Sequence, residues 1–181
     1  HSGAIAVGAT LASQEVNFTL IPEVPFELDG EEGFLAYLKR RILARAHAVI
    51  VVAEGAGQEL IPERPIETDA SGNPRLADIG AFLRERILAY FAAEGIPVNI
   101  RYFDPSYTIR SAPANTDDSL LCDRFARNAV HAAMAGKTDV VMGLWYNTFV
   151  HVPLPLVIHD QKRLTPDSQV WGAVLAATGQ P

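Results

Sequence analysis

The sequence predicts an α/β fold: a layered, parallel-type sheet with helices on both faces. Three observations indicate this class. Apolar residues along the 181-residue chain alternate between period-2 spacing, typical of strands, and helical spacing. The run Ala48–Ala53 is apolar on both faces, as expected of a central strand in a covered parallel sheet. Helix-length segments separate the strands, as crossovers between parallel strands require.

The expected order is helix, strand, helix, strand, helix, strand, helix, two strands and a helix. The first strand spans residues 15–22, because Val16, Phe18 and Leu20 fall on one side. Asp29 is a suitable cap for a helix over about residues 31–46. The apolar residues of that helix recur at helical spacing (Leu35, Leu38 and Ile42).

After the strand Ala48–Ala53, residues 55–74 form a loop rich in Gly, Pro and Asp. Pro74 suits the first position of the next helix, with Asn73 as its cap. One face of this helix is apolar, and Gly95 ends it (Ile79, Leu83, Ile87 and Phe91 form the face). Residues 97–103 alternate as another strand (Val98, Ile100 and Tyr102 on one side).

Residues 104–117 are expected to form a second loop. A long helix follows over about residues 119–135, with Gly136 as its left-handed terminator. Residues 140–145 and 149–152 are strands that can pair through the turn 146–148. Thr165, Pro166 and Asp167 open a last helix, which ends before Gly179.

Composition excludes several classes of function. The formal net charge is −6, so a broad basic face for nucleic acid is not expected. No stretch approaches the roughly 20 apolar residues that span a bilayer, so no membrane partner is expected. The single cysteine, Cys122, leaves no intrachain disulfide and fits a reducing, cytoplasmic compartment.

Two places could carry chemistry beyond the carboxyl ends of the strands, where open α/β sheets bind ligands. Glu54 follows the apolar strand and precedes Gly55, whose small size would let a ligand approach the backbone. Its carboxylate could accept hydrogen bonds from sugar hydroxyls, although an ordinary exposed strand-end glutamate is the commoner case. Arg101 and Arg110 could form a local anion site, or each could pair with a neighbouring aspartate (Asp104 or Asp117).

Other polar or reactive residues point to ordinary structural roles. Lys39–Arg41 is interpreted as a solvated helix face, His131 as a helix-face histidine and Cys122 as a core residue. No second His or Cys lies at metal-ligand spacing from His131, so no metal site built by this chain is expected. The Gly-x-Gly-x-x-Gly and Walker A patterns are both absent.

Several segments together resemble the carboxyl-terminal portion of the 6-phosphofructokinase family. They occur in the family's order along nearly the whole chain (His1–Ala6, Phe18–Phe26, Ala53–Gly55, Tyr107–Ser111 with Cys122 after it, and Val130–Gly136). Tyr107 and Ala112–Pro113 make the chain most similar to the long branch shared by plants, trypanosomes and many bacteria. The resemblance implies a phosphofructokinase-like, Rossmann-like substrate domain.

The resemblance also implies roles for single residues. Glu54 would bind the hydroxyls of fructose 6-phosphate, and Arg101 would reach the substrate of a neighbouring subunit, which implies a homo-oligomer, a dimer or a tetramer. The 6-phosphate would be bound by one short segment (Tyr107, Thr108, Ile109 and Arg110). Glu23 matches a position near the allosteric effector site of the short bacterial enzymes. No catalytic residue is assigned, because the family's base would lie upstream of His1.

By resemblance, residues 1–110 form most of the fructose 6-phosphate domain, residues 111–152 pack into a donor-binding domain, and residues 153–181 return to the substrate domain. The expected function is ATP-dependent phosphorylation of fructose 6-phosphate to fructose 1,6-bisphosphate, an early step of glycolysis. Mg²⁺ would be bound outside this chain, which is expected to be an inactive fragment by itself. Two alternatives are pyrophosphate as the phosphoryl donor and a non-catalytic sugar-phosphate-binding module.

Overall fold

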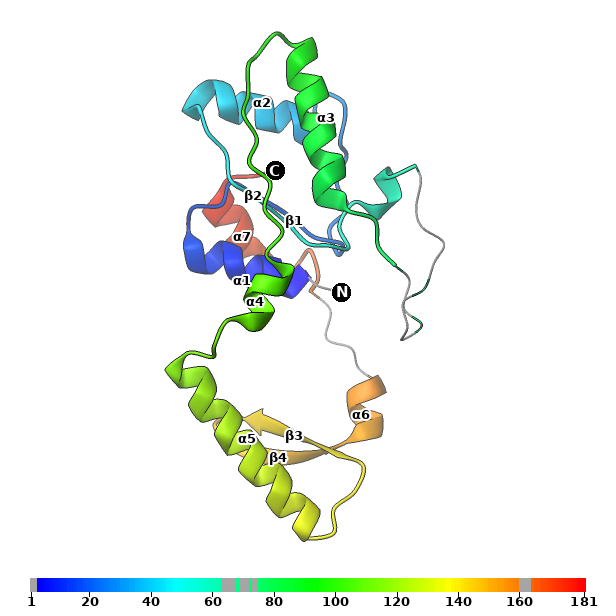
Figure 1. The fold of residues 1–181 in the computed structure, drawn as a ribbon, viewed down its shortest axis with the longest axis vertical. Coiled ribbons are helices and arrows are strands. Elements are labelled where there is room, and N and C mark those ends of the chain that lie inside the picture. The colour runs from blue at the N-terminus through cyan, green and yellow to red at the C-terminus, as the bar shows by residue number, and fades with distance from the viewer. Residues whose placement is uncertain (1–2, 63–67, 69–71, 73–74, 160–163) are drawn as a thin grey trace. The chain divides into compact units, whose positions relative to one another are not determined.

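The computed structural model describes residues 3–62, 68, 72, 75–159 and 164–181 (Figure 1). The chain divides into two compact units. Unit 1 comprises His1–Asp104 with Arg163–Pro181, and unit 2 comprises Pro105–Lys162. The unit boundaries differ from the predicted ones at residues 110 and 152. The binding roles assigned to those domains remain predictions.

The sheet of unit 1 is a parallel pair of strands, β1 (Phe18–Leu20) and β2 (Ile50–Val52), with Phe18 opposite Ile50. The remaining elements of unit 1 are helical: α1 (Gly3–Ser13), α2 (Phe34–Arg45), the 3₁₀ turn η1 (Gln58–Leu60), α3 (Ile79–Ala93) and α7 (Gln169–Thr178). α1 packs on both strands and on α7, although α7 comes from the other end of the chain (Figure 1).

The core of unit 1 is apolar and continuous. Leu35 of α2, Phe91 of α3 and Val174 of α7 are each at most 1% exposed. Edge-to-face contacts join the ring of Phe34 to those of Phe18 and Phe26, with centroids 5.3 and 6.1 Å apart. The predicted apolar face of α3 is confirmed, because all four of its residues are buried (Ile79, Leu83, Ile87 and Phe91).

The outer edge of β1 is closed by a side chain. In a parallel pair, alternate residues direct their backbone groups to opposite sides, and those of Phe18 and Leu20 bond toward β2. The backbone N–H and carbonyl of Thr19 therefore point away from β2. Its N–H donates to Oε1 of Gln180 at 2.6 Å, and its carbonyl accepts from Nε2 of Gln180 at 3.1 Å.

Unit 2 contains α4 (Ser106–Ser111), α5 (Thr116–Met134), β3 (Val140–Trp145), β4 (Thr148–Pro153) and α6 (Leu154–His159). The predicted pairing of the two strands is confirmed. They form an antiparallel hairpin in which Trp145 lies opposite Thr148. Its two-residue turn has positive φ at Tyr146 and Asn147, 44° and 61°, as the right-handed twist of a hairpin favours. α5 packs on the hairpin through the rings of Phe125 and Phe149, whose centroids are 5.0 Å apart.

Several predicted helix ends were wrong. Asp29 does not cap α2: the cap position is Gly33, with no side-chain hydrogen bond. Asp29 instead accepts two hydrogen bonds from Nη2 of Arg86, both at 2.7 Å. Asp78 caps α3, while Asn73 and Pro74, the predicted start, lie outside the described residues. The last helix begins at Gln169 with Ser168 as its cap, three residues after Pro166.

Two predicted segment types were also wrong. Residues 97–103 form no strand in the described part of the chain. Residues 97–102 line the same cavity as Ile50 and Val52 of β2, and no ladder joins these two described segments. Val98 and Ile100 still pack against the core, which explains their alternation. The predicted loop 104–117 contains α4, which has Pro105 at its N-cap position.

The mixed α/β class is therefore confirmed at the level of helices with small sheets. The described residues contain one parallel pair of strands and one antiparallel hairpin. The larger layered sheet that the sequence predicts is not seen among them. None of the described helices has the length and apolarity needed to cross a membrane.

Core packing yields a first prediction. Leu35→Ala should lower the free energy of unfolding by about 2–5 kcal/mol, because Leu35 is 1% exposed and its truncation leaves a cavity. Leu43→Ala in the same helix should cost less than about 1 kcal/mol, because Leu43 is 66% exposed. Urea denaturation followed by circular dichroism measures both. Equal losses would contradict the described orientation of α2.

Candidate functional site

Glu54 lies at the carboxyl end of β2, as predicted. The ladder ends one residue earlier, where the N–H of Ala53 donates to the carbonyl of Leu20 at 2.9 Å. Glu54 opens the turn that follows, and its side chain is exposed. Within the described ranges, no hydrogen bond or ion pair engages its carboxylate. The carboxylate is therefore available to accept hydrogen bonds from a ligand.

The glycine that this turn requires is Gly57 rather than Gly55. A Cβ at Gly55 would meet Pro22 at 3.5 Å, which is ordinary contact. Gly57 has a φ of +59°, and a Cβ there would meet side chains of Phe26, Ile79 and Leu60 at 3.1–3.3 Å. The approach of a ligand to the backbone at Gly55 stays a prediction, because the contact with Pro22 is internal to the protein.

A buried glutamine holds the turn after β2. Gln58 is 8% exposed, and its Nε2 donates to the carbonyl of Glu54 at 2.8 Å and to that of Ala77 at 3.0 Å. Its Oε1 accepts from the N–H of Ala77 at 3.1 Å. The side chain therefore joins the backbone of Glu54 to the residue that immediately precedes the cap of α3.

The start of α3 is joined in turn to the segment that contains Arg101. Oδ1 of Asp78 accepts from the N–H of Ala81 and from the hydroxyl of Tyr102, both at 2.9 Å. The Tyr102 ring occupies the space above Gly80, where an added Cβ would overlap it. Desolvation, and then the hydrogen bond to Asp78, raise the pKa of Tyr102 to about 12.

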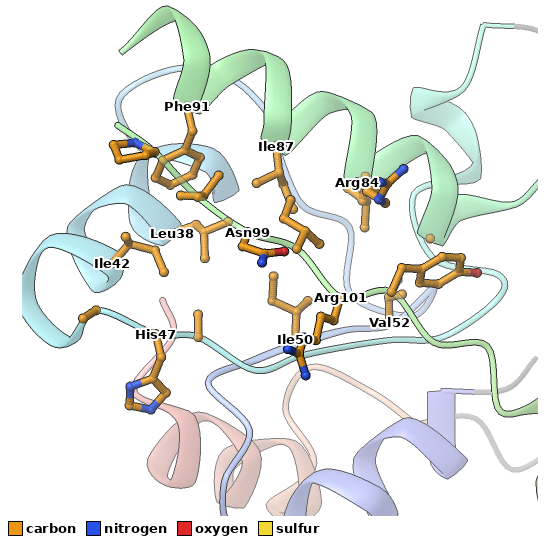
Figure 2. A pocket seen from close by; sticks show the side chains of 18 residues that line it. Leu38, Ile42, His47, Ile50, Val52, Arg84, Ile87, Phe91, Asn99 and Arg101 are labelled. Atoms are coloured by element: carbon orange, nitrogen blue, oxygen red, sulfur yellow. The ribbon is translucent and has the colours of Figure 1, made fainter. Parts of the chain in front are cut away.

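Arg101 lines a cavity of about 430 Å³ between α2, α3, β2 and residues 97–102 (Figure 2). The lining is largely apolar, and it includes Leu38, Ile50 and Phe91. Arg84, Asn99 and His47 contribute polar groups. Arg101 itself is exposed, and no ion pair joins it to Asp104 in the part of the chain that the structure describes. Glu54 is not among the residues that line this cavity.

The predicted phosphate-binding segment belongs to unit 2, where it forms most of α4. Thr108, Ile109 and Arg110 are exposed, and Arg110 lies in the last turn. Between described residues, no ion pair joins Arg110 to Asp117. Glu54 and Arg101 thus share unit 1, whereas the segment from Tyr107 to Arg110 belongs to the other unit.

The residues that we assigned to structural roles lie where we expected them, except for Cys122. Lys39 pairs with Glu94 at 2.6 Å, and that hydrogen bond raises the pKa of its amine. Arg40 lies over the ring of Tyr37, 4.3 Å from its centroid. His131 is on the exposed side of α5, and Cys122, which we predicted to be a core residue, is also exposed. Ala132 is the one residue that the structure shows as buried in α5.

The described residues bring together no group of three or more His, Cys, Asp or Glu side chains. Sequence reasoning also missed Gln58, Asp78 and Tyr102. Asp78 had a recognisable signal, because it directly precedes the apolar face of α3. Gln58 had none, since its partner Ala77 lies 19 residues further along the chain.

Sequence comparison relates this chain to known proteins. The sequence profile of the Phosphofructokinase family matches residues 1–133. "ATP-dependent 6-phosphofructokinase" of Borreliella burgdorferi is 47% identical over 99% of this chain and 42% of its own length. The protein of the same name from Amycolatopsis methanolica is 48% identical over all of this chain and 41% of its own length.

A plant relative extends the comparison. "ATP-dependent 6-phosphofructokinase 5, chloroplastic" of Arabidopsis thaliana is 42% identical over the whole of this chain and 34% of its own length. The chain therefore spans about two fifths of the length of the curated relatives it matches. The chain belongs to the phosphofructokinase family.

The contact between Gly80 and Tyr102 generates a second prediction. In an open helix position such as Gly172, Gly→Ala should stabilise the protein by about 0.5–1 kcal/mol. The Gly80→Ala variant should instead have a free energy of unfolding about 1–2 kcal/mol below that of Gly172→Ala, because the new methyl group displaces the Tyr102 ring from Asp78. Thermal unfolding measures the difference. Placing Gly80→Ala in a Tyr102→Ala background should restore the gain, and a persistent loss there would show that Tyr102 is not the obstacle.

The raised pKa of Tyr102 generates a third prediction. Because the folded-state pKa of about 12 exceeds the ordinary value of 10.0, folding favours the neutral phenol. The resulting stabilisation is complete below pH 10 and is lost as the pH rises toward 12. The tyrosinate absorbance of the folded protein should therefore show one late-titrating residue, which disappears in Tyr102→Phe. A titration unchanged by this substitution would contradict the assignment.

Proposed function

We propose that the full-length gene product containing this sequence transfers the γ-phosphoryl group of ATP to the 1-hydroxyl of fructose 6-phosphate. The observation that carries the proposal is the match of essentially the whole chain, at 47–48% identity, to two proteins named ATP-dependent 6-phosphofructokinase. In this reaction a new P–O bond forms at the sugar, the bond to ADP breaks, and the hydroxyl proton passes to a base. We assign none of these residues as that base.

The contribution of this chain is to bind and orient the sugar phosphate. Glu54 is exposed at a strand end with a free carboxylate, which supports its role as an acceptor for fructose hydroxyls. Arg110 presents an exposed guanidinium that can donate two parallel hydrogen bonds to a phosphate. We assign Tyr107, Thr108 and Ile109 to the same phosphate, as the resemblance implies. Orientation of a reacting hydroxyl contributes several kcal/mol to lowering the barrier.

Arg101 is proposed to reach the fructose 6-phosphate bound by a neighbouring subunit, which makes the protein a homo-oligomer. Its exposed position beside the cavity leaves it accessible to another chain. Light scattering on the full-length gene product measures the oligomeric state. We also propose a cytoplasmic location and a larger parallel sheet, of which β1 and β2 are a part. We further propose that the transfer uses Mg²⁺ bound outside this chain.

The assay that tests the proposal measures formation of fructose 1,6-bisphosphate, with ATP and with pyrophosphate in parallel. Turnover with ATP is expected. Turnover with pyrophosphate alone would show that the phosphoryl donor is pyrophosphate rather than ATP. Saturable sugar-phosphate binding without turnover would favour a non-catalytic binding module. Absence of both binding and turnover would overturn the proposal.

Substitution of the two sugar-phosphate residues gives the fourth prediction. Arg110→Ala should raise the KM for fructose 6-phosphate by about 10–100-fold, because a charged hydrogen bond contributes about 1.5–3 kcal/mol. Glu54→Gln should raise it by about tenfold. The KM for ATP should remain within about twofold in both variants.

Matched controls are available in the same units. Arg127 is an exposed arginine of α5 that pairs with Asp123 at 2.9 Å, and Glu59 is an exposed glutamate close to Glu54. Arg127→Ala and Glu59→Gln should leave both KM values unchanged. An unchanged KM for fructose 6-phosphate in Arg110→Ala would show that the phosphate is bound elsewhere.

A further inference from the structure

We infer that Gln58 and Tyr102 are positioning residues that hold Glu54 and Arg101 in a fixed relation through the backbone of residues 77–78. We call the connected set Gln58, Ala77, Asp78 and Tyr102 the brace. The inference rests on the proposed function, because it concerns how the sugar-phosphate residues of unit 1 are oriented.

Neither Glu54 nor Arg101 is held by its own side chain. Both are exposed, and in the described ranges neither the carboxylate nor the guanidinium takes part in a hydrogen bond or ion pair. Their positions therefore depend on the backbone from which they project. Backbone anchors next to them are the places where their geometry is set.

At Glu54 the anchor is the Gln58 amide. It donates to the carbonyl of Glu54 itself, and it engages both the N–H and the carbonyl of Ala77. These three bonds need two N–H donors and one acceptor on a single terminal group, which a primary amide supplies. Asn would be shorter by a methylene, and Glu would lack the donors, so the bonds specify glutamine.

At Arg101 the anchor is the adjacent Tyr102. Its hydroxyl donates to the same Asp78 oxygen that accepts from Ala81 in the cap of α3. Because Gly80 has no side chain, the ring lies directly against the first turn of the helix. The Gln58 anchor bonds the backbone of Ala77, and the Tyr102 anchor bonds the side chain of Asp78, the next residue in the chain. The peptide between these two residues therefore connects the anchors. A shift at either end is transmitted to the other through that peptide.

The brace is buried at one end and half-exposed at the other, which separates its two parts in experiment. Gln58 is 8% exposed, so its loss will also lower stability, whereas Tyr102 is 44% exposed. Tyr102→Phe removes one hydroxyl and keeps the ring above Gly80. An effect of Tyr102→Phe on substrate binding is therefore a more selective sign of positioning than an effect of Gln58→Met.

The test compares Gln58→Met and Tyr102→Phe in the full-length gene product. Each should lower kcat/KM for fructose 6-phosphate about tenfold, mainly through KM, and leave the KM for ATP unchanged. The double variant should lose little more than the stronger single variant, because one break already releases the brace.

Controls of the same chemistry lie elsewhere in unit 1. Thr178 is a buried hydroxyl that donates to the carbonyl of Val174 at 2.9 Å, and Tyr37 donates its hydroxyl to Glu32. Thr178→Val and Tyr37→Phe should change thermal stability without changing the KM for fructose 6-phosphate. Amide hydrogen exchange at Ala77 gives a readout independent of activity: protection should be present in the wild type and lost in Gln58→Met.

The outcomes separate the two proposals. A wild type that does not phosphorylate fructose 6-phosphate defeats the proposed function, and the positioning role falls with it. An active wild type whose Glu54→Gln variant has a raised KM, but whose Gln58→Met and Tyr102→Phe variants do not, overturns the brace alone. Equal changes in the brace variants and their controls would likewise assign the brace a purely structural role.

Discussion

Unit 1 depends on the parallel pairing of β1 with β2. Each strand has only three residues, and a parallel pair of this length is not stable without cover. α1 and α7 supply that cover, and the buried hydroxyls of Thr10 and Thr19, 2.7 Å apart, join α1 to β1. The last ladder bond, at Ala53, fixes where the strand stops and thereby where Glu54 leaves the sheet.

Features set by local spacing were predictable from the sequence. The buried face of α3 follows from 3.6-residue periodicity, and the hairpin of β3 and β4 follows from two apolar runs around a short turn. The position of Glu54 after an apolar strand was predictable for the same reason. In each case the residues that determine the structure are neighbours along the chain.

Features set by distant partners were not predictable. Asp29 has the side chain of a good cap, but Arg86, 57 residues later, binds both of its oxygens. Residues 97–103 have a strand-like pattern because they pack on the core, and a ladder would also need a neighbouring backbone in contact. Gln58 is the clearest case, since a glutamine in a loop has no sequence signature for bonds to Glu54 and Ala77. The part of the candidate site that could be named in advance is therefore its charged ends, and the part that could not is the connection between them.

The amide of Gln180 at the edge of β1 has a consequence for self-association. A primary amide carries a donor and an acceptor in the same relation as a peptide group, so it satisfies Thr19 as one residue of a neighbouring strand would. It offers no continuing backbone on its far side, and another chain finds no ladder there to extend. Exposed strand edges are where soluble proteins begin to form intermolecular sheets. Within the described residues, a single side chain thus takes the hydrogen-bonding position that a neighbouring strand would occupy at Thr19.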